Sequence, residues 1–179
     1  FLARGMVVSR DEDGKPLRVV ATGTDISALK EHQQQLEHIA HFDALSGLPN
    51  RVLLAYRLQQ AMAQSQRRNQ SLAVASLDLD GFKAVNDRYG HNVGDELLVL
   101  IAQRMKLALR EGDTLARIGG DEFIAVLADL DQPQDCEMVL ARLLQAASAP
   151  ATVGKTPLQV SASIGVTLYP RDGSDADQL

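Results

Sequence analysis

Two pairs of acidic residues in the sequence could hold a cation through their carboxylates. Asp78 and Asp80 end an otherwise apolar run, and a second pair, Asp121 and Glu122, directly follows two glycines. Side chains alternate along a strand, so Asp78 and Asp80 project to the same side, whereas the acids of the second pair point to opposite sides. One acid of that pair can therefore share a metal with Asp78, and the other must act on substrate or water. Because Cys and His do not cluster with these oxygen donors, the pattern favours Mg²⁺ or Mn²⁺ over zinc.

The two glycines, Gly119 and Gly120, join β-rich runs at 114–118 and 122–127, which is a strong signal for a hairpin. Lacking a Cβ atom, glycine permits positive φ and lets a nucleotide approach the backbone closely. An ordinary turn without a ligand explains the same two residues, just as solvated surface explains a single acidic pair.

Polar residues that suit a nucleotide follow the first acidic pair. Lys83 could neutralise a phosphate as a point charge. Asp95 can accept hydrogen bonds from the N1–H and N2 amine of guanine, and the Asn86 amide can donate to the acceptors of that base. Taken alone, an Asn at this position is more often a helix cap than a residue that binds a base.

The hydrophobic pattern predicts the elements that must position these residues. Helical spacing of apolar residues predicts helices at about 51–67, 82–89, 93–109 and 133–147. Apolar, β-rich runs predict strands at 72–79, 114–118, 122–127 and 158–168. This order predicts an α/β fold with one mixed central sheet that is flanked by helices and contains an antiparallel hairpin. Near the N-terminus, runs at 2–8 and 17–22 predict a further hairpin, and a helix begins after Asp25.

Composition and charge limit the classes of function. The chain has 179 residues, a net charge of −5 and a single cysteine, Cys136. An acidic protein creates no overall field that attracts nucleic acid, so no nucleic-acid partner is expected. One cysteine excludes an internal disulfide, and no apolar run approaches the ~18–20 residues of a membrane helix. The single cysteine suits a reducing compartment, so we expect a cytoplasmic domain. We also expect a piece of a longer protein, because the chain begins with Phe1 and not with Met.

Residues 43 to about 177 resemble the GGDEF domain of diguanylate cyclases. The motifs that carry the resemblance occur in the order of the family: Asp-Ala-Leu-Ser-Gly-Leu-Pro-Asn-Arg at 43–51, Asp-Leu-Asp-Gly-Phe-Lys-Ala-Val-Asn-Asp at 78–87 with Gly-Asp at 94–95, and Arg-Ile-Gly-Gly-Asp-Glu-Phe at 117–123. The resemblance implies a central sheet related to those of adenylyl cyclases and polymerase palms. It also implies the condensation of two GTP molecules into cyclic di-GMP.

The resemblance assigns roles to the residues above. Asp78, the Leu79 carbonyl and Asp121 would hold Mg²⁺ or Mn²⁺, and Glu122 would act at the reacting 3′-hydroxyl, as a base or as an extra metal contact. The substrate-binding set would comprise Lys83 at the triphosphate, Asn86 and Asp95 at guanine, and Gly119, Gly120 and Phe82 along the nucleotide. Each domain binds one GTP, so a homodimer is implied for catalysis.

Arg110 and Asp113 admit two interpretations. Gly112 suits the residue after a helix end, with Arg110 facing the last carbonyls. In the GGDEF family that the chain resembles, an Arg-x-x-Asp at this distance before the Gly-Gly-Asp-Glu-Phe motif is the site at which bound product inhibits the enzyme. We favour the second interpretation because the spacing matches: Arg110 would pair with phosphate and stack on guanine, and Asp113 would bind a guanine edge.

Resemblance to known families divides the chain into three parts. Residues 1–25 resemble the closing strands of a PAS sensor domain. Residues 26–42 would form a connector helix that sets the approach of two catalytic domains. Residues 43–179 would form the GGDEF domain, without the helix that follows it in relatives.

The sequence leaves three functions open. An active, signal-controlled and product-inhibited cyclase is the leading hypothesis because Asp78, Asp121 and Glu122 are all present. A regulatory module that binds GTP or cyclic di-GMP, attached to an EAL phosphodiesterase domain, is the alternative. An adenylyl-cyclase-like enzyme is disfavoured by Asn86 and Asp95, which suit guanine.

Overall fold

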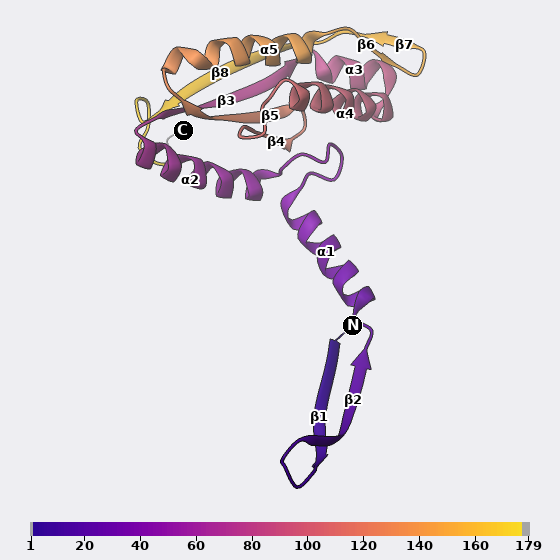
Figure 1. Cartoon of the computed structure of the whole chain (residues 1–179). Coiled ribbons are helices and arrows are strands. Elements are labelled where there is room, and N and C mark those ends of the chain that lie inside the picture. Colours follow the sequence, from indigo (N-terminus) through magenta and orange to yellow (C-terminus); the bar gives the residue numbers. More distant parts are fainter. Residues whose placement is uncertain (1, 177–179) are drawn as a thin grey trace. The chain divides into compact units, whose positions relative to one another are not determined.

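The computed structural model describes residues 2–176. The chain divides between Ala40 and His41 into two compact units, each of which is described by itself (Figure 1). Within the described residues, no helix combines the length and the apolar character needed to cross a membrane.

The first unit is a hairpin followed by a helix, as the sequence predicts. Strand β1 (Leu2–Arg10) pairs antiparallel with β2 (Pro16–Thr24). The carboxylate of Asp11 closes the turn between them by accepting hydrogen bonds from the backbone of Asp13 and Lys15. Helix α1 (Ser27–His41) begins after Asp25, whose carboxylate accepts from the Ser27 amide at 2.9 Å. An acid at this position stabilises the start of a helix because it satisfies a free N–H group.

The second unit is built on a four-stranded sheet in the order β4-β5-β3-β8 (Figure 1). Its strands are β3 (Ser71–Asp80), β4 (Thr114–Gly119), β5 (Glu122–Leu130) and β8 (Ser161–Tyr169). The predicted α/β class is confirmed, but all three pairings are antiparallel, so the expectation of mixed strand directions is wrong. The reason is the order of the strands: β4 runs parallel to β3, but its hairpin partner β5 lies between the two.

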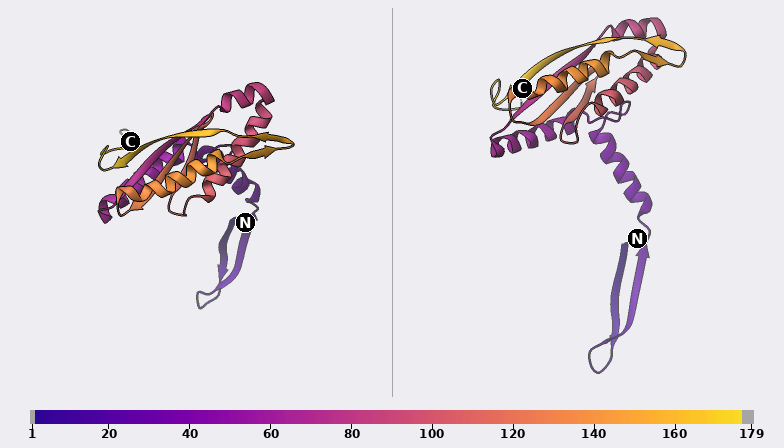
Figure 2. Two further views of the ribbon diagram at one scale, coloured as in Figure 1. Left: turned by 90° about the horizontal axis from the view of Figure 1, so that it is seen from above. Right: turned by 45° about the horizontal axis from the view of Figure 1, so that its top comes forward.

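Helices cover both faces of this sheet (Figure 2). Helix α2 (Arg51–Arg68) packs on β3, β4 and β5. On the other face, α5 (Cys136–Ser148) packs on β3 and β8, and it also contacts α4 (His91–Leu107). The short helix α3 (Phe82–Tyr89) follows β3 and packs on α4, and a 3₁₀ turn (Pro133–Asp135) precedes α5.

A small hairpin precedes the last strand and was not predicted. Strands β6 (Ala151–Val153) and β7 (Thr156–Leu158) pair across a turn at Gly154, which has a φ of 59°. The predicted strand at 158–168 is therefore wrong at its start, since β8 begins only at Ser161. Glycine at the position of positive φ between two short β-rich runs was the available signal.

The first half of β3 is buried on both faces, and burial alternates only in its second half, which shows where the sheet is left open. Leu72 and Val74 pack toward α2, in one cluster with Leu54 and Leu58. Their neighbours on the opposite face join the larger core of α4 and α5; they are Ala73, Ala75, Leu77 and Leu79. Beyond Val74, the side chains on the α2 face are Ser76, Asp78 and Asp80, and all three are exposed. Helix α2 thus covers only the first half of β3, and the end of the strand presents polar groups to solvent.

The start of α2 offers a test of the fold. The Asn50 side chain accepts hydrogen bonds from the amides of Val52 and Leu53 at 3.0 and 3.1 Å. Replacing an Asn cap by Ala leaves these amides without a partner, so Asn50→Ala should lower the free energy of unfolding by about 1 kcal/mol. Urea denaturation measures this change. The exposed Gln59→Ala in the same helix is the control and should change little, and an equal loss in both variants would contradict the capping role.

Candidate active site

The acidic residues come together at the open end of the sheet. Asp78 lies directly opposite Glu122 on β5 and opposite Ser163 on β8. Directly opposed residues share one face of a sheet, so Asp78 and Glu122 stand on the same uncovered face. Asp121 lies in the turn before β5, where the strict alternation of a strand no longer applies. The predicted division of the two acids between opposite sides is therefore wrong, since both of them lie near Asp78.

The charges of these acids act on one another. The pKa of Asp78 is raised by partial loss of hydration, then by the negative charge of Asp121 and, to smaller extents, by Glu122 and Asp80. A like charge nearby disfavours the ionised form of a carboxyl group. The end of the sheet is therefore a place where a cation would relieve repulsion.

Asp80 has a different environment from Asp78. Its two carboxylate oxygens accept hydrogen bonds from the hydroxyls of Ser161 and Ser163, at 2.9 and 3.0 Å. The side chain is thus held toward β8. Neither serine is predicted from the sequence as a partner of Asp80, although their spacing of two residues is the spacing that places two side chains on one face of a strand.

Arg117 holds the glycine turn in place. Its side chain is only 10 % exposed, and its Nη1 donates to the Asp43 carboxylate at 2.8 Å. Its Nε and Nη2 donate to the Gly120 carbonyl at 2.9 and 2.7 Å. The Asp43 carboxylate also accepts from the backbone and hydroxyl of Ser46. One guanidinium therefore fastens the turn before Asp121 to the loop that precedes α2, a role that the sequence analysis did not assign.

The residues expected to bind the nucleotide lie on α3 and α4. Asn86 stands on α3 and Asp95 on the first turns of α4, two helices that pack together. Within residues 2–176, the buried Oδ1 of Asn86 has no hydrogen-bond partner. Lys83 is exposed, as a phosphate ligand requires, whereas Phe82 is only 6 % exposed and belongs to the core. Phe82 thus supports α3 from beneath.

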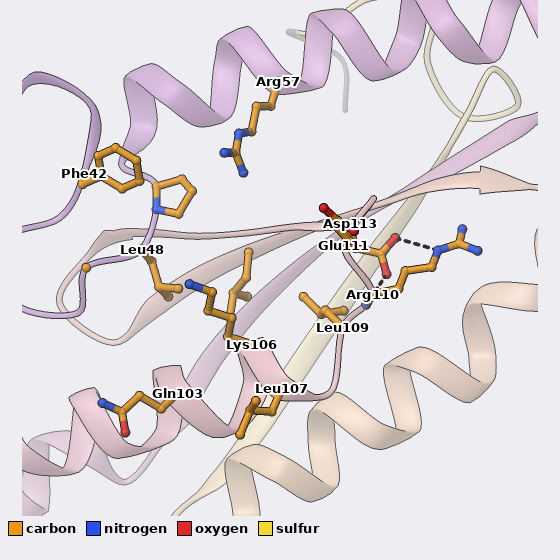
Figure 3. Close-up of a pocket in the computed structure, with 13 residues that line it drawn as sticks. Phe42, Leu48, Arg57, Gln103, Lys106, Leu107, Leu109, Arg110, Glu111 and Asp113 are labelled. Atoms are coloured by element: carbon orange, nitrogen blue, oxygen red, sulfur yellow. Dashed lines mark hydrogen bonds and ion pairs between the residues drawn. The ribbon is translucent and has the colours of Figure 1, made fainter. Parts of the chain in front are cut away.

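Arg110 and Asp113 lie at the far end of β4 from the glycine turn, beside a cavity of about 760 Å³ (Figure 3). Their side chains form an ion pair, with Arg110 Nε 3.4 Å from Asp113 Oδ1. The Asp113 side chain is only 1 % exposed, and it also accepts from the Ala128 amide at 3.3 Å. The Arg110 guanidinium donates in addition to the carbonyls of Ala128 and Asp129. Figure 3 shows two further cations, Arg57 and Lys106, at the same cavity.

The fold and this arrangement of acids define a class of protein. The chain belongs to the GGDEF family: residues 40–179 match the family described as diguanylate cyclase, GGDEF domain. The family resemblance expected from the motifs at 43–51, 78–95 and 117–123 is confirmed.

Three similar proteins come from Pseudomonas aeruginosa. The chain is 42 % identical to the bifunctional diguanylate cyclase/cyclic di-GMP phosphodiesterase MucR, over 86 % of this chain and 22 % of MucR. It is 38 % identical to the cyclic di-GMP phosphodiesterase NbdA, over 86 % of this chain and 20 % of NbdA. A solved structure comprising only the GGDEF domain of TpbB matches with a TM-score of 0.75 at 38 % identity, over 78 % of this chain and 81 % of that one. The chain thus spans about a fifth of the length of MucR and NbdA.

Acid titration tests the contact between Asp43 and Arg117. Partial burial by itself raises the pKa of Asp43, but the hydrogen bonds from Ser46 and the Arg117 guanidinium outweigh it and hold the pKa below the ordinary value. A lowered pKa contributes stability that is present above the unfolded value of about 3.9 and is lost as pH falls through the folded value. Urea midpoints of the wild type should therefore fall more steeply below about pH 4 than those of Asp43→Asn. Parallel curves for the two proteins would contradict this role of Asp43.

Proposed function

We propose that the chain condenses two GTP molecules into cyclic di-GMP and releases pyrophosphate. The observation that supports this function best is the meeting of Asp78, Asp121 and Glu122 at the open end of the sheet, beside a turn of two glycines. The face is exposed, so a triphosphate has access to it. The mutual repulsion of the acids also means that a triphosphate can bind there only together with cations.

The oxygen donors at this end of the sheet fit Mg²⁺ or Mn²⁺. In the described part of the chain, no three Asp, Glu, His or Cys side chains converge on one metal position. Mg²⁺ is commonly held by one or two carboxylates together with waters and substrate phosphates. Asp78 and Asp121, with the Leu79 carbonyl, are a sufficient protein share of such a site. The bound ion would stabilise negative charge on the attacking and leaving oxygens.

The protein's own residues would bind the substrate and move the proton. Glu122, opposite Asp78, would take the proton of the ribose 3′-hydroxyl. The 3′-oxygen then bonds to the α-phosphorus of the second GTP, and the bond to pyrophosphate breaks. Two such attacks, one from each nucleotide, close the ring. Lys83 would offset phosphate charge, Asn86 and Asp95 would grip the guanine edge, and the turn at Gly119 and Gly120 would let the nucleotide lie close to the backbone.

A homodimer follows from this chemistry. Each domain would hold one GTP, so two copies must meet with their open faces toward each other. We further propose that residues 1–25 are the closing strands of a PAS sensor and that α1 sets the approach of the two domains. A signal at the sensor could then control the rate of encounter. Product formation that rises faster than linearly with protein concentration would support the dimer.

Substitution of the acids tests the activity directly. Asp78→Asn removes a metal ligand and Glu122→Gln removes a base, so each should lower the rate of cyclic di-GMP formation at least about 100-fold. The rate is measured by chromatography after incubation with GTP and Mg²⁺. Asp131→Asn is the control, because Asp131 follows the opposite end of β5 and bonds to Gln70. Full activity of either active-site variant would refute the proposed roles.

Thermal unfolding separates lost chemistry from lost folding in the same variants. The pKa of Asp78 is raised, so the ionised side chain destabilises the metal-free fold above that pKa. In EDTA at neutral pH, Asp78→Asn should therefore unfold at a higher temperature than the wild type. Added Mg²⁺ should stabilise the wild type and should no longer stabilise the variant. A lower melting temperature of the variant in EDTA would show that Asp78 has a structural role.

A regulatory module is the second candidate, because the chain is similar both to a bifunctional cyclase and to a phosphodiesterase. Such a module binds GTP or cyclic di-GMP and acts on an EAL phosphodiesterase domain in the same polypeptide. If this candidate is correct, the protein binds GTP but forms no cyclic di-GMP at any protein concentration. The cyclase assay above therefore distinguishes the two candidates.

Product inhibition is proposed for the pair Arg110 and Asp113. The half-exposed Arg110 lies at the cavity, and its guanidinium suits phosphate and the face of guanine. Because Asp113 is already bonded to Arg110 and Ala128, a ligand would have to replace the contact between the two side chains.

Calorimetry tests the proposed inhibitory site. Arg110→Ala should weaken cyclic di-GMP binding about tenfold or more, since a hydrogen bond to a charged group contributes about 1.5–3 kcal/mol. Arg67→Ala is the matched control, because Arg67 is exposed in the last turn of α2 and does not line the cavity. Unchanged binding in Arg110→Ala would leave this pair with the structural role alone.

A further inference from the structure

Gly94 occupies a position where a side chain would displace the carboxamide of Asn86. It is buried in the first turns of α4 and has an ordinary helical conformation. A methyl group on Gly94 would lie 1.9 Å from the Asn86 Oδ1, 3.0 Å from the Asn86 Cγ and 3.2 Å from the Phe82 Cζ. The carboxamide of Asn86 thus fills the space that any other residue at position 94 would need for its own Cβ.

This glycine opposes the local preference of the helix. Glycine in a helix interior is less favourable than alanine by about 1 kcal/mol. Conformational freedom does not explain it, because its φ is not positive. The close approach of Asn86 is therefore the physical reason for glycine here, and the constraint acts between two helices that are joined only by Gly90.

The contact also accounts for the unsatisfied oxygen of Asn86. Its Oδ1 is buried without a hydrogen-bond donor in the described residues, and it lies against the Gly94 backbone, where a Cα–H group offers a weak contact. Asn86 as a whole stays partly exposed. The close packing of this oxygen against Gly94 restricts the carboxamide, and the partial exposure of the residue leaves room for a ligand to approach it. The Phe82 ring, packed in the core, closes the other side of this contact.

We infer that Gly94 is a positioning residue that fixes the Asn86 carboxamide for recognition of the guanine base. The inference rests on the proposed function, because it concerns the nucleotide that the same site takes. Asn86 discriminates between bases only if its amide has one orientation, and the missing Cβ of Gly94 permits that orientation. Gly94 acts through Asn86 and does not touch the nucleotide.

The test compares affinities for GTP and ATP in Gly94→Ala, Asn86→Ala and the double variant. The wild type should prefer GTP, and Gly94→Ala should lose about tenfold to 100-fold of this preference, as one or two misplaced hydrogen bonds would cause. Affinity for ATP, which does not use the guanine contacts, should stay within about twofold. In the Asn86→Ala background the carboxamide that the added methyl group would displace is absent, so Gly94→Ala should change the preference by less than about twofold.

Stability gives a second readout that does not depend on nucleotide binding. Asn86→Ala/Gly94→Ala should be more stable than Gly94→Ala, because the two shortest contacts, with the Asn86 side chain, are absent and alanine at position 86 favours helix α3. Gly5→Ala is the control substitution, since the nearest atom to its new methyl group is 3.7 Å away. If the double variant is no more stable than Gly94→Ala, or if Gly94→Ala keeps the full preference for GTP, the inference is wrong. A wild type that binds no GTP would instead refute the proposed function.

Discussion

The buried guanidinium of Arg117 is the contact on which the candidate site depends. A turn of two glycines has no side chains of its own to fix it, and its backbone has φ values of 156° and 53° that other residues rarely adopt. Arg117 supplies the missing constraint by donating twice to the Gly120 carbonyl and once to Asp43. Removing one partner of a buried pair leaves the other charge unpaired, which is strongly destabilising. The placement of Asp121 beside Asp78 is therefore set by a residue on β4 and a loop more than 70 positions earlier.

The packing of the sheet explains why the acids can stand together. Helix α2 buries Leu72 and Val74 and leaves the rest of the same face of β3 uncovered, so the acids remain in water. Water screens their repulsion, which inside the core would be prohibitive. The apolar side chains on the other face of β3 continue to its last residues, where Leu79 is 1 % exposed. The apolar face of β3 thus holds the strand in the core, and its polar face carries the acids of the candidate site.

Much of this arrangement could be predicted from the sequence, and the parts that could not depend on pairing between distant strands. Helix α3 falls at the predicted 82–89 because glycines flank it on both sides. The alternation of apolar and acidic residues likewise placed Asp78 and Asp80 on one face. The sequence did not show that β5 separates β3 from β4, that Glu122 is opposite Asp78, or that Ser161 and Ser163 hold Asp80. These features depend on the order of the strands and on the register between them, and local propensity carries no information about either.

The two arginines at the ends of β4 make similar contacts but suit different roles. Arg117 and Arg110 each pair with an aspartate and also donate to backbone carbonyls, Arg117 to that of Gly120 and Arg110 to that of Asp129. Arg117 is 10 % exposed, so a ligand cannot reach its guanidinium without opening the core. The Arg110 side chain is 58 % exposed and borders a cavity, so in the proposed product inhibition a phosphate or a guanine ring would compete for it at little cost in packing. Exposure, and not the pattern of contacts, therefore separates the arginine that holds the structure from the one that is available to a ligand.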